Sequence, residues 1–181
     1  MKKTLLTLLA IGIIPNTLTA HTIQTGTIEV TGGTSLNFSS GEIDRNGNDI
    51  DLDETELSLT SLYYIAPNLG IGLHWEYEST EIENSDSSET IIGPAFAFNI
   101  PIAPQMSIKP LGYIALLNGE EGTTDYDGTE WGLGVDANYF IRDNISLNAG
   151  IVYTSQDINI DGGGDFKWTS FQTKVGLSVY F

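Results

Sequence analysis

The sequence contains no cysteine, few basic residues and only one long apolar run. Without cysteine, the 181-residue chain forms no disulfide and offers no thiolate ligand to a metal. Seven lysines and arginines stand against 24 aspartates and glutamates, for a formal charge of −17, and this excludes nucleic acid as a partner. The apolar run, from Leu5 to Ile14, is shorter than the roughly 20 residues of a membrane-spanning helix, which excludes a helical membrane protein.

The N-terminus has the features of a secretory signal peptide. Lys2 and Lys3 precede the apolar run, and residues 18–20 follow it as a cleavage site, Leu-Thr-Ala. We expect residues 1–20 to be removed and residues 21–181 to form the mature domain. Two of the seven basic residues leave with the signal, so the mature domain keeps five of them beside its 24 acidic residues.

From about residue 26 onward, apolar and polar side chains alternate with a period of two, which predicts β-strands. Turn residues divide this part of the chain into eight strands, at 26–38, 55–66, 69–79, 89–101, 105–117, 129–141, 145–155 and 168–181. Short connections at 67–68, 102–104 and 142–144 alternate with long ones at 39–54, 80–88, 118–128 and 156–167. Short turns at one end and long loops at the other predict an all-β fold, an eight-stranded antiparallel up-and-down transmembrane β-barrel.

Alternation alone also fits a soluble barrel of lipocalin type, whose apolar face points inward. Two features favour the membrane barrel. The polar face is rich in glycine, for example at Gly132 and Gly134, which suits a narrow interior. The apolar face also becomes acidic and polar beyond Tyr77 and Tyr153, as expected where a strand leaves lipid for water. We therefore expect apolar side chains to face lipid, and hairpins one and four to project beyond the membrane as sheet.

The last strand reads Lys174-Val175-Gly176-Leu177-Ser178-Val179-Tyr180-Phe181, with alternating hydrophobic residues and a terminal phenylalanine. On this strand and on its architecture, the chain resembles the family of small outer-membrane β-barrels that includes the OmpA- and OmpX-type domains and the opacity porins. The resemblance implies that the barrel assembly machinery reads Lys174, Gly176, Val179 and Phe181 as an assembly signal. It also implies the outer membrane of a Gram-negative bacterium, with lipid and lipopolysaccharide as neighbours.

The inward positions of the predicted strands carry ionisable side chains. These are Glu29, His74, Glu76, Lys109, Asp136 and Lys174. We interpret them as a polar network that holds the lumen closed, because charges inside membrane proteins almost always pair. The alternative is a narrow path for ions or protons. His74 and Glu76 are the nearest approach to a catalytic pair, but no serine is placed beside them, so we expect no enzymatic function.

One segment resembles a calcium-binding loop. Asp157, Asn159, Asp161 and Asp165 supply oxygen ligands at positions one, three, five and nine, with glycine at six. Position twelve is Trp168 rather than glutamate, so a glycine-turn hairpin with acids facing water is the simpler interpretation. Apart from calcium here, no cofactor is expected.

Nearly all the acidic residues lie toward the long loops; Glu29, Asp136 and Asp143 are the exceptions. Such an acidic end attracts divalent cations and repels anions. The sequence therefore predicts a non-enzymatic surface barrel that acts in adhesion, in contact with a surface or host ligand, or in envelope structure. A narrow channel or transporter for small solutes is the alternative.

Overall fold

The computed structural model describes residues 21–37, 52–82, 85–160 and 164–181, and these residues are mostly β-strand. The strands are β1 (Ile28–Asn37), β2 (Leu52–Ala66), β3 (Leu69–Ile82), β4 (Ser85–Phe98), β5 (Ile100–Ala103), β6 (Met106–Glu121), β7 (Thr124–Arg142), β8 (Ile145–Ile160) and β9 (Asp165–Tyr180). Within the described ranges, no helix is long and apolar enough to cross a membrane. The predicted signal peptide lies outside these residues.

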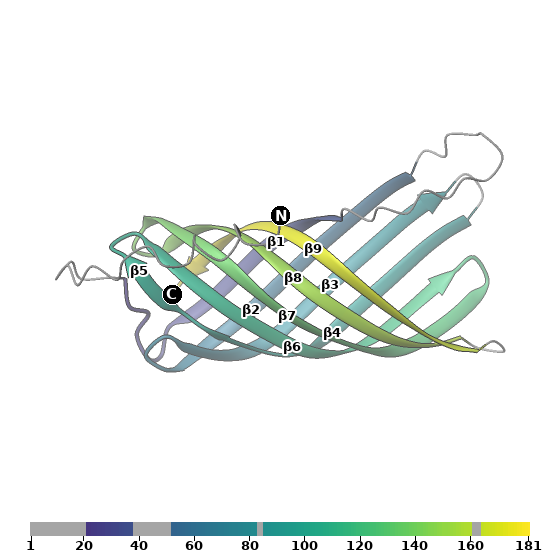
Figure 1. Cartoon of the computed structure of the whole chain (residues 1–181), viewed down its shortest axis with the longest axis horizontal. Helices are drawn as coiled ribbons and strands as arrows, with labels where there is room; N and C mark the ends of the chain where they lie inside the picture. The colour runs from purple at the N-terminus through teal and green to yellow at the C-terminus, as the bar shows by residue number, and fades with distance from the viewer. Residues whose placement is uncertain (1–20, 38–51, 83–84, 161–163) are drawn as a thin grey trace, which may run out of the picture.

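The strands form one antiparallel sheet that closes on itself. Strands joined by a turn pair with each other, and the circle is completed by the pairing of β1 with β9 and of β4 with β6. β4 and β5 are two parts of one predicted strand, because only Asn99 separates them and both pair with β6. The fold is therefore the predicted eight-stranded up-and-down barrel (Figure 1).

The two faces of the wall have opposite chemistry. Leu133 and Leu147 face outward and are 54% and 49% exposed, whereas Asn138 and Asn148 face the lumen and are 1% and 7% exposed. An exposed apolar band around a polar interior is the arrangement of a barrel in lipid, and it is the inverse of a soluble lipocalin-type barrel. The predicted orientation of the faces is confirmed.

We call the end of the barrel with the short turns the lower end and the end with the long connections the upper end. The lower turns are as short as predicted, but the upper hairpins contain more sheet than predicted. The structure pairs β3 with β4 up to Ile82 and Ser85, and β6 with β7 up to Glu121 and Thr124. The loops predicted at 80–88 and 118–128 are thus mostly strand, and that prediction is wrong. At the second of them, Glu121, Thr124 and Asp125 form sheet although their side chains are exposed, so no apolar alternation marks the strands there. Hairpin four extends to Asn159 and so projects as predicted. Most of loop 39–54 lies outside the described residues.

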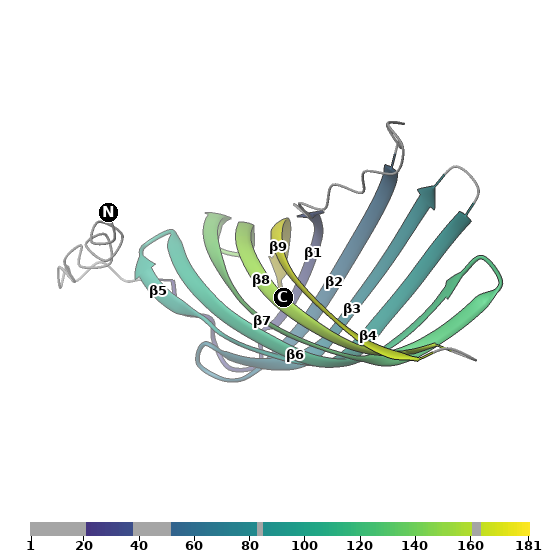
Figure 2. The ribbon, with the colours of Figure 1, turned by 45° about the vertical axis from the view of Figure 1, so that its right-hand side comes forward.

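The β1–β2 ladder ends lower than the other ladders. Its last pair is Gly33 and Ser58, although both strands continue upward, β1 beside β9 and β2 beside β3. Above this pair, Thr34 Oγ1 donates a hydrogen bond to the carbonyl oxygen of Glu56 at 3.0 Å. In Figure 2, β2 continues past the upper end of β1. The junction between β1 and β2 is therefore the weakest backbone connection between neighbouring strands at the upper end of the described barrel.

Glycines make room for the large side chains of the lumen. A Cβ atom at Gly132 would lie 2.4 Å from the ring of Tyr113, its partner across the β6–β7 ladder. A Cβ atom at Gly150 would lie 2.2 Å from a carboxylate oxygen of Asp136. Both positions therefore need glycine so that an aromatic ring and a carboxylate can occupy the narrow interior.

Candidate functional site

The lower part of the lumen holds a buried ion cluster. Lys109 Nζ lies 2.7 Å from Glu29 Oε1 and 3.6 Å from Asp136 Oδ2. The Glu29 carboxylate also accepts hydrogen bonds from the hydroxyl groups of Tyr64 at 2.6 Å and Ser178 at 2.8 Å. Because Glu29 and Lys109 are almost fully buried, these contacts replace the water that each charge loses on folding.

A second ion cluster lies higher in the lumen. Lys174 Nζ lies 2.6 Å from Glu76 Oε2 and 3.7 Å from Glu56 Oε1. His74 Nε2 lies 3.3 Å from the same oxygen of Glu76, and His74 Nδ1 shares a hydrogen bond of 2.9 Å with Thr60 Oγ1. The structure thus divides the six predicted lumen residues into two clusters and adds Glu56, which shares the inward face of β2 with Ser58 and Thr60.

Further polar residues link the upper cluster to the projecting hairpins. The ring of Tyr113 stacks on His74 with 4.1 Å between centroids, and its hydroxyl donates to Glu130 at 2.5 Å. Gln156 Nε2 donates to Glu130 at 2.8 Å and to Glu89 at 3.0 Å. Glu89 lies above the apolar band, where burial and then the charge of Glu130 raise its pKa to about 7. These four residues were not among the predicted lumen residues, although alternation places Glu130 inside.

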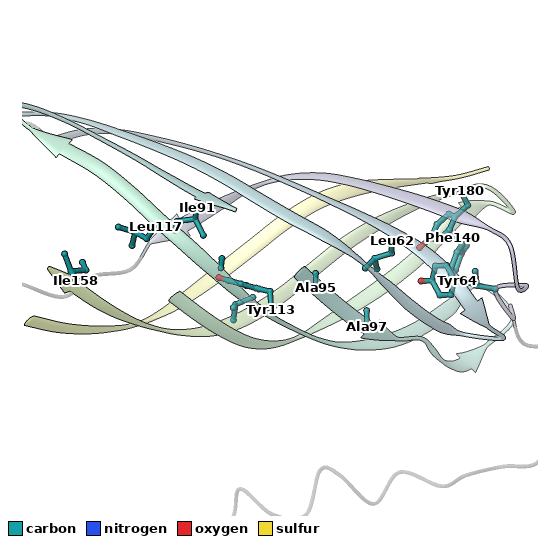
Figure 3. Packing of buried hydrophobic residues seen from close by; sticks show 13 residues of the cluster. Leu62, Tyr64, Ile91, Ala95, Ala97, Tyr113, Leu117, Phe140, Ile158 and Tyr180 are labelled. Atoms are coloured by element: carbon teal, nitrogen blue, oxygen red, sulfur yellow. The ribbon is translucent and has the colours of Figure 1, made fainter. Parts of the chain in front are cut away.

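Apolar side chains close the lumen at both ends. At the lower end, Phe140 packs against Tyr180 with 5.5 Å between ring centroids, and Tyr64 lies beside them (Figure 3). Ile23 is buried there, and its backbone N–H donates to Asn68 Oδ1 at 2.9 Å. At the other end, the buried residues are Ile91, Leu117 and Ile158 (Figure 3). Together with the ion clusters, these layers leave no wide passage among the described residues.

His74 has neighbours on both ring nitrogens, as the histidine of a hydrolase has. Thr60 offers a hydroxyl and Glu76 a carboxylate. Yet Thr60, His74 and Glu76 lie within paired strands, whose backbone N–H groups form the hydrogen bonds of the sheet. These strands therefore offer no pair of free N–H donors that could stabilise an oxyanion. The arrangement can orient and polarise the imidazole, but it lacks the remaining parts of an acyl-transfer site.

The predicted calcium ligands are only partly within the described residues. Asp157 and Asn159 are exposed on β8, and Asp157 Oδ1 lies 2.6 Å from Lys167 Nζ. Asp161 and the side chain of Asp165 lie outside the described residues. Over the part that is described, no group of three or more acidic or histidine side chains is arranged to hold a metal ion. The calcium site stays a prediction.

The residues of the predicted assembly signal have separate places in the folded barrel. Lys174 belongs to the upper ion cluster, and Gly176 pairs with Gly33 in the β1–β9 ladder. Val179 pairs with Val30, and the side chain of Phe181 is exposed at the lower rim. Reading of this strand by the assembly machinery stays a prediction.

Comparison with known proteins identifies the family but no near relative. The family model "Outer membrane protein beta-barrel domain" matches residues 6–178. A search of curated proteins found no match. Among solved structures, the chain is similar to the outer membrane protein OprG from Pseudomonas aeruginosa, with a TM-score of 0.53 and 14% identity over 87% of this chain and 97% of that one.

Two further structures show the same fold. Neisserial surface protein A gives a TM-score of 0.53 and 16% identity, over 86% of this chain and 95% of that one. The attachment invasion locus protein Ail of Yersinia pestis gives 0.52 and 11%, over 88% and 100%. At such identities the likeness concerns the fold alone. Since the family model covers nearly the whole chain, the chain belongs to the outer membrane protein β-barrel domain family, whose members lie in the outer membrane.

Proposed function

We propose that this barrel is a non-enzymatic surface protein whose projecting acidic hairpins mediate adhesion or contact. The observation that carries the proposal is the continuation of paired sheet above the apolar band, with carboxylates along its strands. Glu120 lies opposite Asp125, and both side chains are exposed. Like charges opposite each other destabilise a sheet. Folding gains nothing from this arrangement, which supports a role in binding.

The charge of the hairpins defines the kind of partner. Among the described residues above the apolar band, Lys167 is the only lysine or arginine. A cationic surface, or an anionic one such as lipopolysaccharide bridged by calcium, complements this field, whereas a bare anionic surface is repelled. Of the structural neighbours, the Ail protein is described as an attachment invasion locus protein, so a barrel of this fold is compatible with the proposed role.

Hairpin three, formed by β6 and β7, offers a matched pair of variants for testing adhesion. In the first, Glu120→Gln, Asp125→Asn and Asp127→Asn remove three negative charges; in the second, Thr123→Ser, Thr124→Ser and Thr129→Ser keep the charge. We expect the first to reduce attachment of proteoliposomes to polylysine, and to lipopolysaccharide with calcium, at least severalfold. The second should attach like the unaltered protein. Equal attachment by all three would overturn the proposal.

A narrow channel is the second candidate, favoured by cavities within the lumen between the two ion clusters. Solute flux into liposomes by the unaltered barrel, together with attachment that does not depend on the hairpin charges, would support it. A deletion strain that becomes sensitive to detergent without losing attachment or uptake would instead indicate a structural role in the envelope.

A further inference from the structure

A side-chain contact at the upper end of the lumen joins strands that are not neighbours in the wall. Gln156 lies on β8 and Glu89 on β4, with β6 and β7 between them. Gln156 Nε2 nevertheless donates hydrogen bonds to Glu89 Oε1 at 3.0 Å and to Glu130 Oε2, on β7, at 2.8 Å. In Figure 2, the β3–β4 and β8–β9 hairpins, which this contact joins, lie on either side of the β6–β7 hairpin. We call Glu89, Gln156 and Glu130 the strut.

The strut is stable while one of its two carboxyl groups holds a proton. An ionised carboxylate only accepts hydrogen bonds, and here one amide nitrogen donates to both carboxyl groups. If both were ionised, two negative charges would lie on one amide in a place with little water to screen them, since Glu130 is buried. A proton on either group removes this repulsion.

The surroundings of Glu89 make it the group that titrates. The titratable groups that face it from neighbouring strands are Glu76 and Glu78 of β3, Glu121 of β6, and Tyr126 and Glu130 of β7. The ammonium group of Lys174 is bound to Glu76, at 2.6 Å, rather than to Glu89. Burial and then the charge of Glu130 raise the pKa of Glu89 to about 7, and they outweigh the hydrogen bonds from Tyr126 and Gln156, which lower it.

The strut lies beside the apolar residues that close the upper end of the lumen. Ile91 follows Glu89 by two positions on the inward face of β4, and Ile158 follows Gln156 by two positions on the inward face of β8. Both isoleucines are buried, together with Leu117. Movement of β4 away from β8 therefore also separates Ile91 from Ile158 and opens this closure.

We propose that the strut is a proton-operated latch on the upper end of the lumen. While the strut holds its proton, Gln156 keeps β4 and β8 together and the apolar closure stays shut. When Glu89 ionises, its charge repels Glu130, the strut breaks, and the β3–β4 hairpin moves away from the β8–β9 hairpin. The latch is closed at low pH and opens as the pH rises past the pKa of Glu89. It is independent of the proposed role in adhesion, which uses exposed carboxylates.

The distance between the two hairpins tests the latch directly. The chain has no cysteine, so Ser88→Cys on β4 and Thr169→Cys on β9 give unique positions for two spin labels on the barrel in lipid nanodiscs. Pulsed electron paramagnetic resonance at about pH 5.5 and about pH 8.5 samples both sides of the titration. We expect a population with a longer distance that grows at least about fivefold at the higher pH. An unchanged distance distribution would overturn the proposal.

Variants of the labelled barrel connect the movement to the strut. Glu89→Gln has no proton to lose, so the shorter distance should persist at both pH values. Gln156→Ala removes the amide, so the longer distance should be populated at both. Glu120→Gln, the control, removes an exposed carboxylate of hairpin three and should leave the response to pH unchanged. A response that survives in Glu89→Gln, or a shorter distance at both pH values in Gln156→Ala, would contradict the latch.

Access to the lumen gives a readout without spin labels. Val152 faces the lumen on β8 and is 2% exposed. At the lower pH, a charged thiol reagent should modify Val152→Cys at least about tenfold faster when Gln156→Ala is also present than when Gln156 is kept. Equal rates would mean that the strut does not control the closure, and the proposal would be wrong.

Discussion

The carboxylates inside the barrel and those on its projecting hairpins meet different physical demands. Inside, Glu29 and Glu76 are buried, with lysine ammonium groups at 2.7 and 2.6 Å. On hairpin three, Glu120 lies opposite Asp125 in water. Salt and water screen exposed charges, whereas a buried charge without a partner costs several kcal/mol. Removing the partner of a lumen carboxylate should therefore cost far more stability than removing that of a hairpin carboxylate.

Removal of the Lys109 ammonium should have the largest effect on stability. In Lys109→Met, Glu29 and Asp136 lose their cation while staying buried. We expect the free energy of unfolding to fall by about 3–5 kcal/mol, measured by urea titration in lipid vesicles. The double variant with Glu29→Gln should recover part of this loss, because one buried charge is then removed. If the single variant is as stable as the double variant, an unpaired carboxylate in the lumen costs no more than an exposed one.

Glu89 lies on a projecting hairpin but is buried like the lumen carboxylates, so its contribution to stability should depend on pH. Its pKa is raised from 4.5 to about 7, so between these values the folded barrel holds a proton that the unfolded chain has released. Stability from this group is therefore present at low pH and is lost as the pH rises toward 7. We expect a loss on the order of 3 kcal/mol, read from urea midpoints across this range.

The control for this effect is Glu89→Gln, which keeps the shape of the side chain and has no proton to lose. Its stability should depend less on pH than that of the unaltered barrel, since other groups still titrate. If the stability of the variant and that of the unaltered barrel depend on pH in the same way, the Glu89 carboxylate titrates like an exposed one, and its assignment to the buried carboxylates is wrong.

The strands were predictable where lipid and lumen make opposite demands on the two faces. Along β7, outward Trp131 and Leu133 alternate with inward Glu130 and Gly132, so period and orientation could both be obtained from the sequence. Above Gly128 both faces meet water, and alternation no longer separates sheet from loop. The predictions therefore ended the strands too early at the top.

The inward side of each strand was predictable, but the contacts among the inward side chains were not. Alternation identifies inward positions, yet which ones meet depends on the register of the strands and on space across the barrel. Tyr113 shows this, because its ring lies over Gly132 and so places its hydroxyl beside Glu130. Asp136 and Glu130 consequently make contacts at different levels of the lumen, although they share one strand and one face.

The ion pair of Asp157 and Lys167 should contribute least to stability. Its atoms lie 2.6 Å apart, as close as those of Glu76 and Lys174, but both side chains are exposed. We expect Lys167→Gln to change the free energy of unfolding by less than about 0.5 kcal/mol in the same urea titration. It should strengthen calcium binding by hairpin four if Asp157 is a ligand, and Asp157→Asn in the same background should reverse that gain. A loss of stability comparable to that of Lys109→Met would show that distance, rather than burial, determines the value of an ion pair in this barrel.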